Sequence, residues 1–212
     1  MKRILMLGLC LLFGSKVCAT EPNIDANGVL TELEKTFSKI KTVQTDFVQT
    51  KKLKLFKHPV ILKGHLLLQV PDRLLWRVHE PIQYAFMLKG KKAFEWDQET
   101  GKTKKLPFTG SPVIEQILVQ IKSWFSGEFS QLKKSYDLKI LSQTPLVLSF
   151  TPKATNKAKH VIQEMRINIR QDRHYIESMA IFEVNGDLTT TRFQNVLLNQ
   201  EIPAKAWEVA PR

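Results

Sequence analysis

The chain has 212 residues, 43% of them hydrophobic and 25% charged, which suits one folded domain and excludes an intrinsically disordered chain. Its 32 basic and 20 acidic residues give a formal charge of +12. Such an excess favours an anionic partner: nucleic acid, a membrane surface or an acidic protein.

Residues 1–19 predict a secretory signal peptide. A basic start precedes an apolar run over residues 4–13, and small residues lead to a cleavage site after Ala19. The run is about half as long as a membrane-spanning helix needs to be, and an uncleaved N-terminal anchor is the alternative. We therefore expect an exported protein, which fits a bacterial periplasm, with residues 20–212 as a single domain.

Cleavage changes both the charge and the cysteine count. Lys2, Arg3 and Lys16 leave, so 32 less three gives 29 basic residues against 20 acidic ones, a net charge of +9. Cys10 and Cys18 leave as well, so the mature chain has no thiol for a disulfide. Its stability must then come from a hydrophobic core alone.

The N-terminal half of the mature chain predicts one helix and then strands. Residues 27–45 have the apolar spacing of an amphipathic helix. Leu74, Trp76 and Val78 share one face of a predicted strand, and Leu75, Arg77 and His79 share the other. Segments compatible with strands are 45–56, 60–69, 73–79, 83–88 and 92–97.

The C-terminal half predicts a second helix and a second group of strands. Residues 112–125 have helical spacing, with Pro112 just inside the start. Asn185-Gly186 is the strongest hairpin signal in the chain, and 202–209 is predicted to be extended. The further strands are predicted at 136–141, 146–151, 161–170, 175–184 and 188–197.

About ten strands at hairpin spacing with two helices predict a mainly β (α+β) fold. The pattern favours one antiparallel sheet, strongly curved or barrel-like, with the helices packed on its concave face. Regular βαβ alternation is missing, which argues against a doubly wound fold. The apolar side chains of such a sheet can form an ordinary packed core or a cavity that holds acyl chains, and both interpretations remain open.

Sequence signals for catalysis, cofactors or metals are missing. The five histidines lack metal-ligand spacing, and the chain contains no phosphate loop, dinucleotide fingerprint or nucleophile elbow. The acidic pairs Glu95/Asp97 and Asp172/Glu177 look like solvated strand edges. We therefore predict no enzyme activity, no cofactor and no metal. A hydrolase with dispersed residues is the alternative.

The basic residues gather in small groups, most of them at predicted turns or strand ends. A nucleic-acid interface would favour a single tract with interleaved aromatic residues, so we predict no nucleic-acid partner. Anionic lipid and an acidic protein both remain open as partners. The groups span 51–54, 89–92, 102–105, 133–134 and 153–159.

Several short motifs follow one another along the mature chain. They are Thr45-Asp46-Phe47-Val48-Gln49, Gly64-His65-Leu66, Pro71-Asp72-Arg73-Leu74-Leu75-Trp76 with Pro81, Leu148-Ser149-Phe150-Thr151-Pro152-Lys153, Gly186-Asp187-Leu188-Thr189, Phe193-Gln194-Asn195-Val196 and Asn199. Their order and spacing resemble the LolA-type family of periplasmic lipoprotein carriers across nearly the whole mature chain.

The resemblance implies an incomplete antiparallel barrel of about eleven strands, with helices as a lid. A monomeric carrier would take the acyl chains of a lipoprotein from an inner-membrane transporter and pass them to an outer-membrane receptor. No covalent chemistry is implied. The implied cavity residues are Phe47, Leu66, Leu68, Leu74, Trp76, Val78, Phe86, Phe94 and Trp96, and the lid helix would present Val113, Ile117 and Ile121.

One position departs from the family pattern. In the well-known carriers, an arginine immediately before the proline of the Pro-Asp-Arg motif helps to close the lid, and here that position is Val70. Arg73 could replace it only if its side chain points inward. The departure favours, as alternatives, a carrier of a glycolipid or lipid-linked pigment. A non-transporting envelope module that binds or senses lipid is a further alternative.

Overall fold

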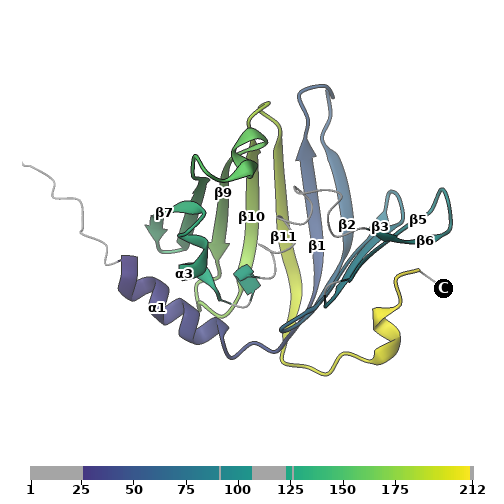
Figure 1. Ribbon diagram of the computed structural model, residues 1–212, viewed down its shortest axis with the longest axis horizontal. Helices are drawn as coiled ribbons and strands as arrows, with labels where there is room; N and C mark the ends of the chain where they lie inside the picture. Colours follow the sequence, from purple (N-terminus) through teal and green to yellow (C-terminus); the bar gives the residue numbers. More distant parts are fainter. Residues whose placement is uncertain (1–25, 91, 107–122, 126, 211–212) are drawn as a thin grey trace, which may run out of the picture.

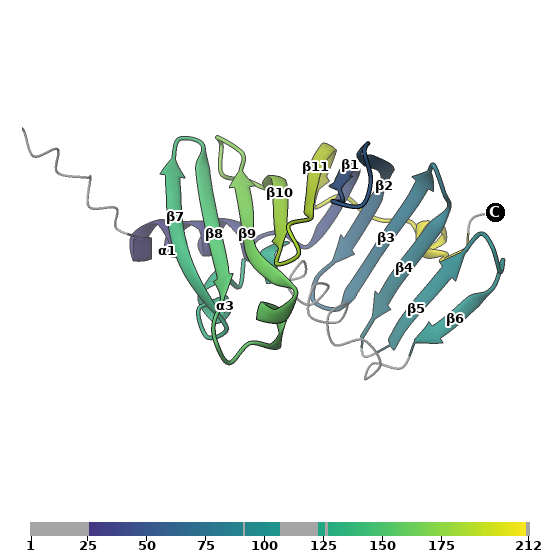
Figure 2. The ribbon, with the colours of Figure 1, turned by 90° about the horizontal axis from the view of Figure 1, so that it is seen from above.

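The computed structural model describes residues 26–90, 92–106, 123–125 and 127–210. In this part of the chain one antiparallel sheet has the order β6-β5-β4-β3-β2-β1-β11-β10-β9-β8-β7 (Figures 1 and 2). β6 and β7 are its two edges, so the sheet curves without closing, which confirms the predicted fold class. The strands are β1 (Thr42–Lys52), β2 (Val60–Gln69), β3 (Arg73–Glu80), β4 (Tyr84–Lys89), β5 (Lys92–Asp97), β6 (Thr103–Leu106), β7 (Tyr136–Gln143), β8 (Leu146–Pro152), β9 (Ile162–Ile169), β10 (Ile176–Glu183) and β11 (Leu188–Leu198).

Short helical segments accompany the sheet. They are α1 (Ala26–Phe37), α3 (Phe129–Leu132) and the 3-10 turns η1 (Lys157–His160) and η2 (Ala204–Trp207). Residues 123–125 are helical too, as predicted for the end of the 112–125 helix. The proposed lid residues Val113, Ile117 and Ile121 lie outside the described residues.

The predicted helix over 27–45 ends at Phe37, earlier than expected. The backbone N–H of Ile40 donates to the Phe37 carbonyl at 2.9 Å, and Thr42 already pairs with Gln69 of β2. Ile40 and Val43 are nonetheless buried. Helical spacing therefore continued past the helix because a turn and a strand happened to bury residues at the same interval.

Two further segments differ from the prediction. The strand expected over 45–56 ends at Lys52, which places Leu55 in a loop. β6 was not predicted, because its sequence Thr-Lys-Lys-Leu has no apolar alternation, yet Thr103 pairs with Trp96 of β5. The Asn185-Gly186 hairpin is confirmed, with Gly186 at a φ of +87°.

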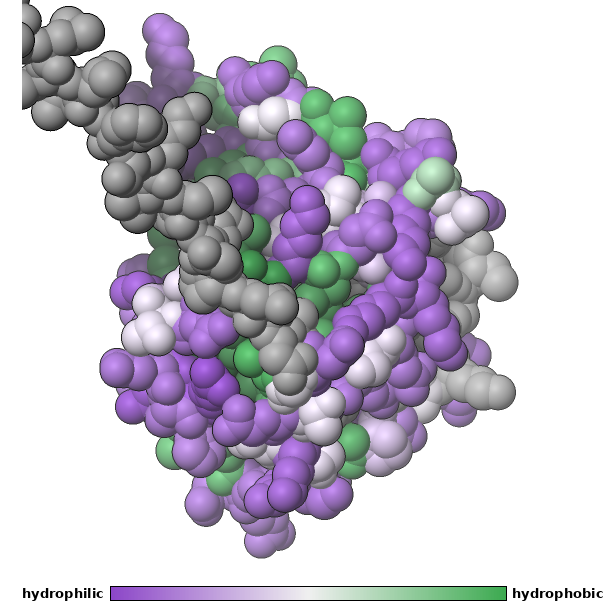
Figure 3. Space-filling view, turned by 90° about the vertical axis from the view of Figure 1, so that its left-hand side faces the viewer, coloured by the Kyte–Doolittle hydropathy of each residue, from purple (hydrophilic) through white to green (hydrophobic). Residues whose placement is uncertain are grey.

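The two faces of the sheet are both apolar in places. The inner face carries α1 and α3: Leu30, Leu33 and Phe37 of α1 are at most 1% exposed and belong to one large cluster with the sheet. Seen from the side of α1 and β7, the surface is mainly hydrophilic, with hydrophobic residues gathered near the middle (Figure 3).

The outer face carries the C-terminal segment, residues 199–210, beside β3–β5 (Figure 2). This segment was predicted to be extended, but it contains η2. Trp207 is 3% exposed, and the Arg73 guanidinium lies 4.3 Å from the centre of its ring. The outer cluster consists of Leu75, Ala85, Met87, Trp96, Trp207 and Val209.

We expect Trp207→Ala to lower the free energy of unfolding by about 3 kcal/mol, because it removes a buried indole from this cluster. Lys205→Ala, an exposed position in the same segment, should change it by less than about 0.5 kcal/mol. Urea denaturation followed by circular dichroism measures both. Equal effects of the two substitutions would mean that the C-terminal segment is not docked on the outer face.

Candidate functional site

The inner face contains an aromatic pair that crosses three strands. Phe47 of β1 is paired with Gly64 of β2, and its ring stacks on Trp76 of β3 with 4.0 Å between the ring centres. The Phe47 ring lies over Gly64, since a Cβ built there would be 2.5 Å from Phe47 Cζ. Glycine in a strand often marks such a close approach. The Gly64 of the sequence motif therefore makes room for the pair.

At the end of the sheet farthest from α1, some inner-face side chains of β1–β4 are partly exposed. Leu66 and Leu68, nearer the α1 end, are 0% exposed. Leu62 and Tyr84 at the far end are only partly buried, and so is Trp76, which is paired with Leu66, whereas Val78 opposite Tyr84 is 4% exposed. The inner face is thus a continuous apolar surface that becomes accessible at one end.

The inner face continues over β8–β11, beneath residues 123–125 and α3. Phe125 meets Phe193 of β11 edge to face at 5.3 Å, and Trp124 lies 6.3 Å from Phe150 of β8. Trp124 is 1% exposed, and among the described residues its indole Nε1 has no hydrogen-bond partner. A buried N–H donor without an acceptor costs about 1–3 kcal/mol, which a bound carbonyl group could recover.

Gly127 brings these helical segments close to α1. Its φ is +75°, and an added Cβ would lie 2.6 Å from Phe37 Cβ. Phe37 in turn meets Phe129 of α3 edge to face at 5.5 Å. Glycine satisfies both the left-handed backbone and the close packing.

Most of the predicted cavity residues share the inner face, but two do not. Phe47, Leu66 and Leu68, together with Leu74, Trp76, Val78 and Phe86, belong to the inner cluster or pack against it. Phe94 and Trp96 lie on the outer face instead, because Phe86 is paired with Glu95 and the aromatic residues of β5 alternate with it. Placing Phe94 and Trp96 with the others was wrong.

Sequence reasoning also missed inner-face residues. The second half of the sheet also supplies many buried apolar side chains, and its strands show alternation too, so this signal was available. Trp124 and Phe125 were considered only as the end of a helix. The missed residues include Val43, Leu88, Leu148, Phe150, Met165, Ile167, Met179 and Phe193.

The acidic pair Glu95/Asp97 has structural partners. Burial, and then the neighbouring Glu95 carboxylate, raises the pKa of the Tyr84 hydroxyl, which is hydrogen-bonded to Glu95. Asp97 accepts from the backbone N–H and the hydroxyl of Thr100 at 2.8 and 2.9 Å, and these bonds lower the pKa of Asp97. Each carboxylate thus serves an edge or a turn of the sheet.

The latch position has no inward-facing arginine. Val70 packs against the inner cluster. Arg73 begins β3 with its guanidinium over Trp207, on the outer face. Because successive side chains of a strand point to opposite faces, Arg73 does not replace the arginine that Val70 lacks.

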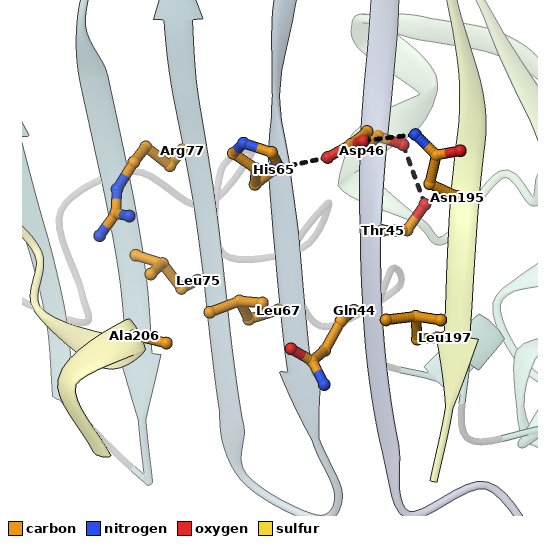
Figure 4. A pocket seen from close by; sticks show the side chains of 10 residues that line it. All are labelled: Gln44, Thr45, Asp46, His65, Leu67, Leu75, Arg77, Asn195, Leu197 and Ala206. Atoms are coloured by element: carbon orange, nitrogen blue, oxygen red, sulfur yellow. Dashed lines mark hydrogen bonds and ion pairs between the residues drawn. The ribbon is translucent and has the colours of Figure 1, made fainter. Parts of the chain in front are cut away.

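A groove of about 370 Å³ crosses β3, β2, β1 and β11 on the outer face (Figure 4). At one end His65 and Asn195 both point to Asp46, and the Asn195 amide donates to its Oδ2 at 2.7 Å. Arg77 donates to the Glu208 carbonyl, and burial lowers the pKa of the Arg77 guanidinium. The remaining lining residues are Gln44, Thr45, Leu67, Leu75, Leu197 and Ala206.

An aspartate–histidine pair suggests a general base, but the groove does not supply its nucleophile. Among the ten residues that line it, the hydroxyl belongs to Thr45, and it donates to the Gln194 carbonyl at 2.7 Å. A nucleophile needs a hydrogen bond to the base. The groove geometry therefore does not favour the hydrolase alternative.

Metal sites and membrane-spanning helices are two further features of the described ranges that bear on function. No group of three His, Cys, Asp or Glu side chains there is placed to hold a metal ion. None of the helices in the same ranges combines the length and the apolar content needed to cross a membrane.

Solved structures share this fold at low sequence identity. An uncharacterized conserved protein from Thermus thermophilus is 9% identical, with a TM-score of 0.52 over 86% of this chain and 93% of the other. A DUF1329 family protein from Desulfovibrio piger is 9% identical, with a TM-score of 0.51 over 85% and 95%. A chain in the Pseudomonas aeruginosa MucA/MucB complex is 12% identical, with a TM-score of 0.52 over 87% of this chain and 61% of that one.

A search among curated protein sequences found no match. Identities this low show the shared fold alone. The protein-family model described as outer membrane lipoprotein carrier protein LolA, however, matches residues 38–210. That range contains every strand of the sheet and most of the inner face. The chain therefore belongs to the LolA family.

Proposed function

We propose that this protein is a periplasmic carrier that holds the acyl chains of a lipoprotein, or of a similar amphiphile, against the inner face of its sheet. The observation that carries the proposal is the continuous apolar inner face of an unclosed sheet, with Trp76 only partly buried. In this function residues 1–19 are removed near Ala19. The monomer then takes cargo from an inner-membrane transporter and delivers it to an outer-membrane receptor.

The energetics explain why such a carrier needs this surface. Each buried methylene of an acyl chain contributes about 0.8 kcal/mol, so a chain crosses an aqueous compartment only inside an apolar container. Trp124 adds a polar contact: its buried Nε1–H, which has no acceptor within the described part of the chain, would donate to an ester or amide carbonyl of the cargo. The cavity residues we propose are Phe47, Leu66, Leu68, Leu74, Trp76, Val78 and Phe86.

The chemical identity of the cargo is a separate question. The latch position is occupied by Val70, which has no guanidinium, and the guanidinium of Arg73 lies on the outer face. Closure therefore does not use the arginine latch of the well-known lipoprotein carriers. This favours a glycolipid or a lipid-linked pigment as a second candidate cargo. The fold shared with MucB, which forms a complex with MucA, supports a further candidate: an envelope module that binds lipid and protein without moving cargo.

Lipid extraction tests the proposal. We expect protein purified from a bacterial periplasm to contain stoichiometric acylated molecules, which mass spectrometry of the extract identifies as lipoprotein, glycolipid or pigment. Incubation with inner-membrane vesicles and then outer-membrane vesicles should move the same molecules between them. Bound lipid without transfer would indicate the non-transporting module, and protein free of lipid that also takes none from vesicles would contradict the proposal.

A further inference from the structure

The loop between β1 and β2 exposes two adjacent apolar side chains. Leu55 is 95% exposed and Phe56 is 59% exposed. We call residues 53–59 the β1–β2 tip, and Figure 1 shows this hairpin extending beyond its neighbours. Single exposed hydrophobic residues are common on proteins. Two adjacent ones on a protruding hairpin are less usual, because together they form a small contiguous apolar patch.

Lysines surround the tip. Lys52, Lys54 and Lys57 are exposed, and Lys51 precedes them at the end of β1. The backbone N–H of Lys54 donates to Asp187 Oδ1 at 2.8 Å, which ties the tip to the β10–β11 hairpin. That hairpin adds another exposed apolar residue, Val184, at 58%.

The two carboxylates of the β10–β11 hairpin do not cancel the lysines of the tip, and Glu80, at the same end of β3, is paired with Lys63 at 2.8 Å. Asp187 is shared with the Lys54 backbone and the Asn185 amide. Burial, and then Asp187, raises the pKa of Glu183, while Lys51 opposes this rise. Even with both carboxylates ionised, four lysines against two carboxylates leave the surface positive, and Lys157 and Lys159 of η1 add to it.

We propose that the β1–β2 tip docks this protein onto an anionic lipid membrane. Leu55 and Phe56 enter the interface between headgroups and acyl chains, while Lys52, Lys54 and Lys57 contact the headgroups. A lysine near an anionic membrane contributes about 1 kcal/mol, and buried apolar area adds to it. A specific protein interface instead requires a complementary surface of about 1,000 Å² or more, which a seven-residue hairpin tip does not provide.

The position of the tip relative to the inner face supports docking with this end of the sheet toward the membrane. The inner face becomes accessible at the same end of the sheet, since Leu62 follows the tip within β2 and Ile181 precedes the β10–β11 hairpin, and both are partly buried. Docking by the tip would turn this accessible end toward the bilayer. The docking surface stands on the tip alone, so it can hold even if the proposed cargo transport fails.

Vesicle co-sedimentation tests the proposal on the mature chain. At about 0.1 M salt, wild-type protein should bind phosphatidylglycerol vesicles at least about tenfold more tightly than phosphatidylcholine vesicles, and about 0.5 M salt should remove most of the difference. L55S/F56S should weaken binding to the anionic vesicles at least about tenfold. The control Leu141→Ser alters a side chain that is 49% exposed, near the opposite end of edge strand β7, and should bind normally.

A charge test complements the apolar one. K52E/K57E should weaken binding to anionic vesicles at least about tenfold, whereas K39E/K41E, an equal reversal in the turn between α1 and β1, should weaken it far less. If both double variants lost the same amount of vesicle binding, the net charge of the protein alone would explain the effect, and the proposal would be overturned. No vesicle binding by the wild type, with tip-dependent binding to soluble polyglutamate, would assign the tip to an acidic protein and also overturn it.

Discussion

Trp76→Glu is expected to lower cargo affinity at least about a hundredfold while the protein stays folded. Trp76 is partly buried and faces the accessible part of the inner face beside Phe47. Free of cargo, a carboxylate there can remain hydrated. An acyl chain laid against it would strip that hydration, which costs several kcal/mol, and about 2.7 kcal/mol already corresponds to a hundredfold. Titration with a fluorescent fatty acyl probe measures the affinity.

Phe94→Glu is the matched control. Phe94 is also an aromatic, partly buried strand residue, but it lies on the outer face with Leu75 and Trp96. Its substitution should disturb stability at least as much as Trp76→Glu and leave acyl-probe binding within about threefold of wild type. If Phe94→Glu lost binding and Trp76→Glu kept it, cargo would bind the outer face and the assignment of the inner face would fail. Trp76→Leu should retain most of the affinity, because it keeps the site apolar.

The case of Phe94 shows what alternation can and cannot predict. Strand alternation places Phe94 and Trp96 together on one face of β5, and Tyr84 and Phe86 together on one face of β4. Which face of β5 points inward depends on its register with β4, and Phe86 is opposite Glu95. Apolar strand residues usually face the core, but the C-terminal segment covers the outer face of β5 and helps to bury Phe94 and Trp96 there. Their apolar character therefore did not indicate which face they occupy.

Long-range contacts explain the other differences as well. The limits of β10 and β11 beside their hairpin followed from the turn residues Asn185-Gly186, which act locally. The end of α1 depends on distant partners: the Lys41 backbone N–H donates to Asn199 Oδ1 at 2.7 Å, and Thr42 pairs with Gln69 of β2. No periodicity within residues 27–45 contains that information, so propensity and apolar spacing extended the helix too far.

The charge of the chain was informative only together with side-chain exposure. Most of the basic groups were expected at turns or strand ends, where solvated charge is ordinary, and the lysines at 51–54 fell within the strand predicted over 45–56. The sequence did not indicate that Leu55 and Phe56 would be exposed to solvent beside these lysines, because 45–56 was predicted to be strand throughout. Because β1 ends at Lys52, the basic group and the two apolar residues form one surface.

The Gly64 position should be the least tolerant of substitution in the inner face. We expect Gly64→Val to lower the free energy of unfolding by about 3 kcal/mol. A Cβ at Gly64 would lie 2.0 Å from the Arg77 carbonyl oxygen and 2.5 Å from Phe47 Cζ. Phe47 could shift only by leaving Trp76, and the carbonyl belongs to the backbone of β3, which is held by pairing on both sides. Urea denaturation measures the loss.

Gly101→Ala separates this crowding from the general effect of replacing a glycine. Gly101 has a φ of +61° but nothing within 4 Å of an added Cβ, so it should cost only the left-handed backbone penalty of about 1 kcal/mol. Combining Gly64→Val with Phe47→Leu should recover only part of the loss, because the clash with the Arg77 carbonyl remains. If Gly64→Val cost no more than Gly101→Ala, the close approach of β2 and β3 would be wrong. The stacking of Phe47 on Trp76 across Gly64, on which the proposed cargo surface depends, would then be wrong as well.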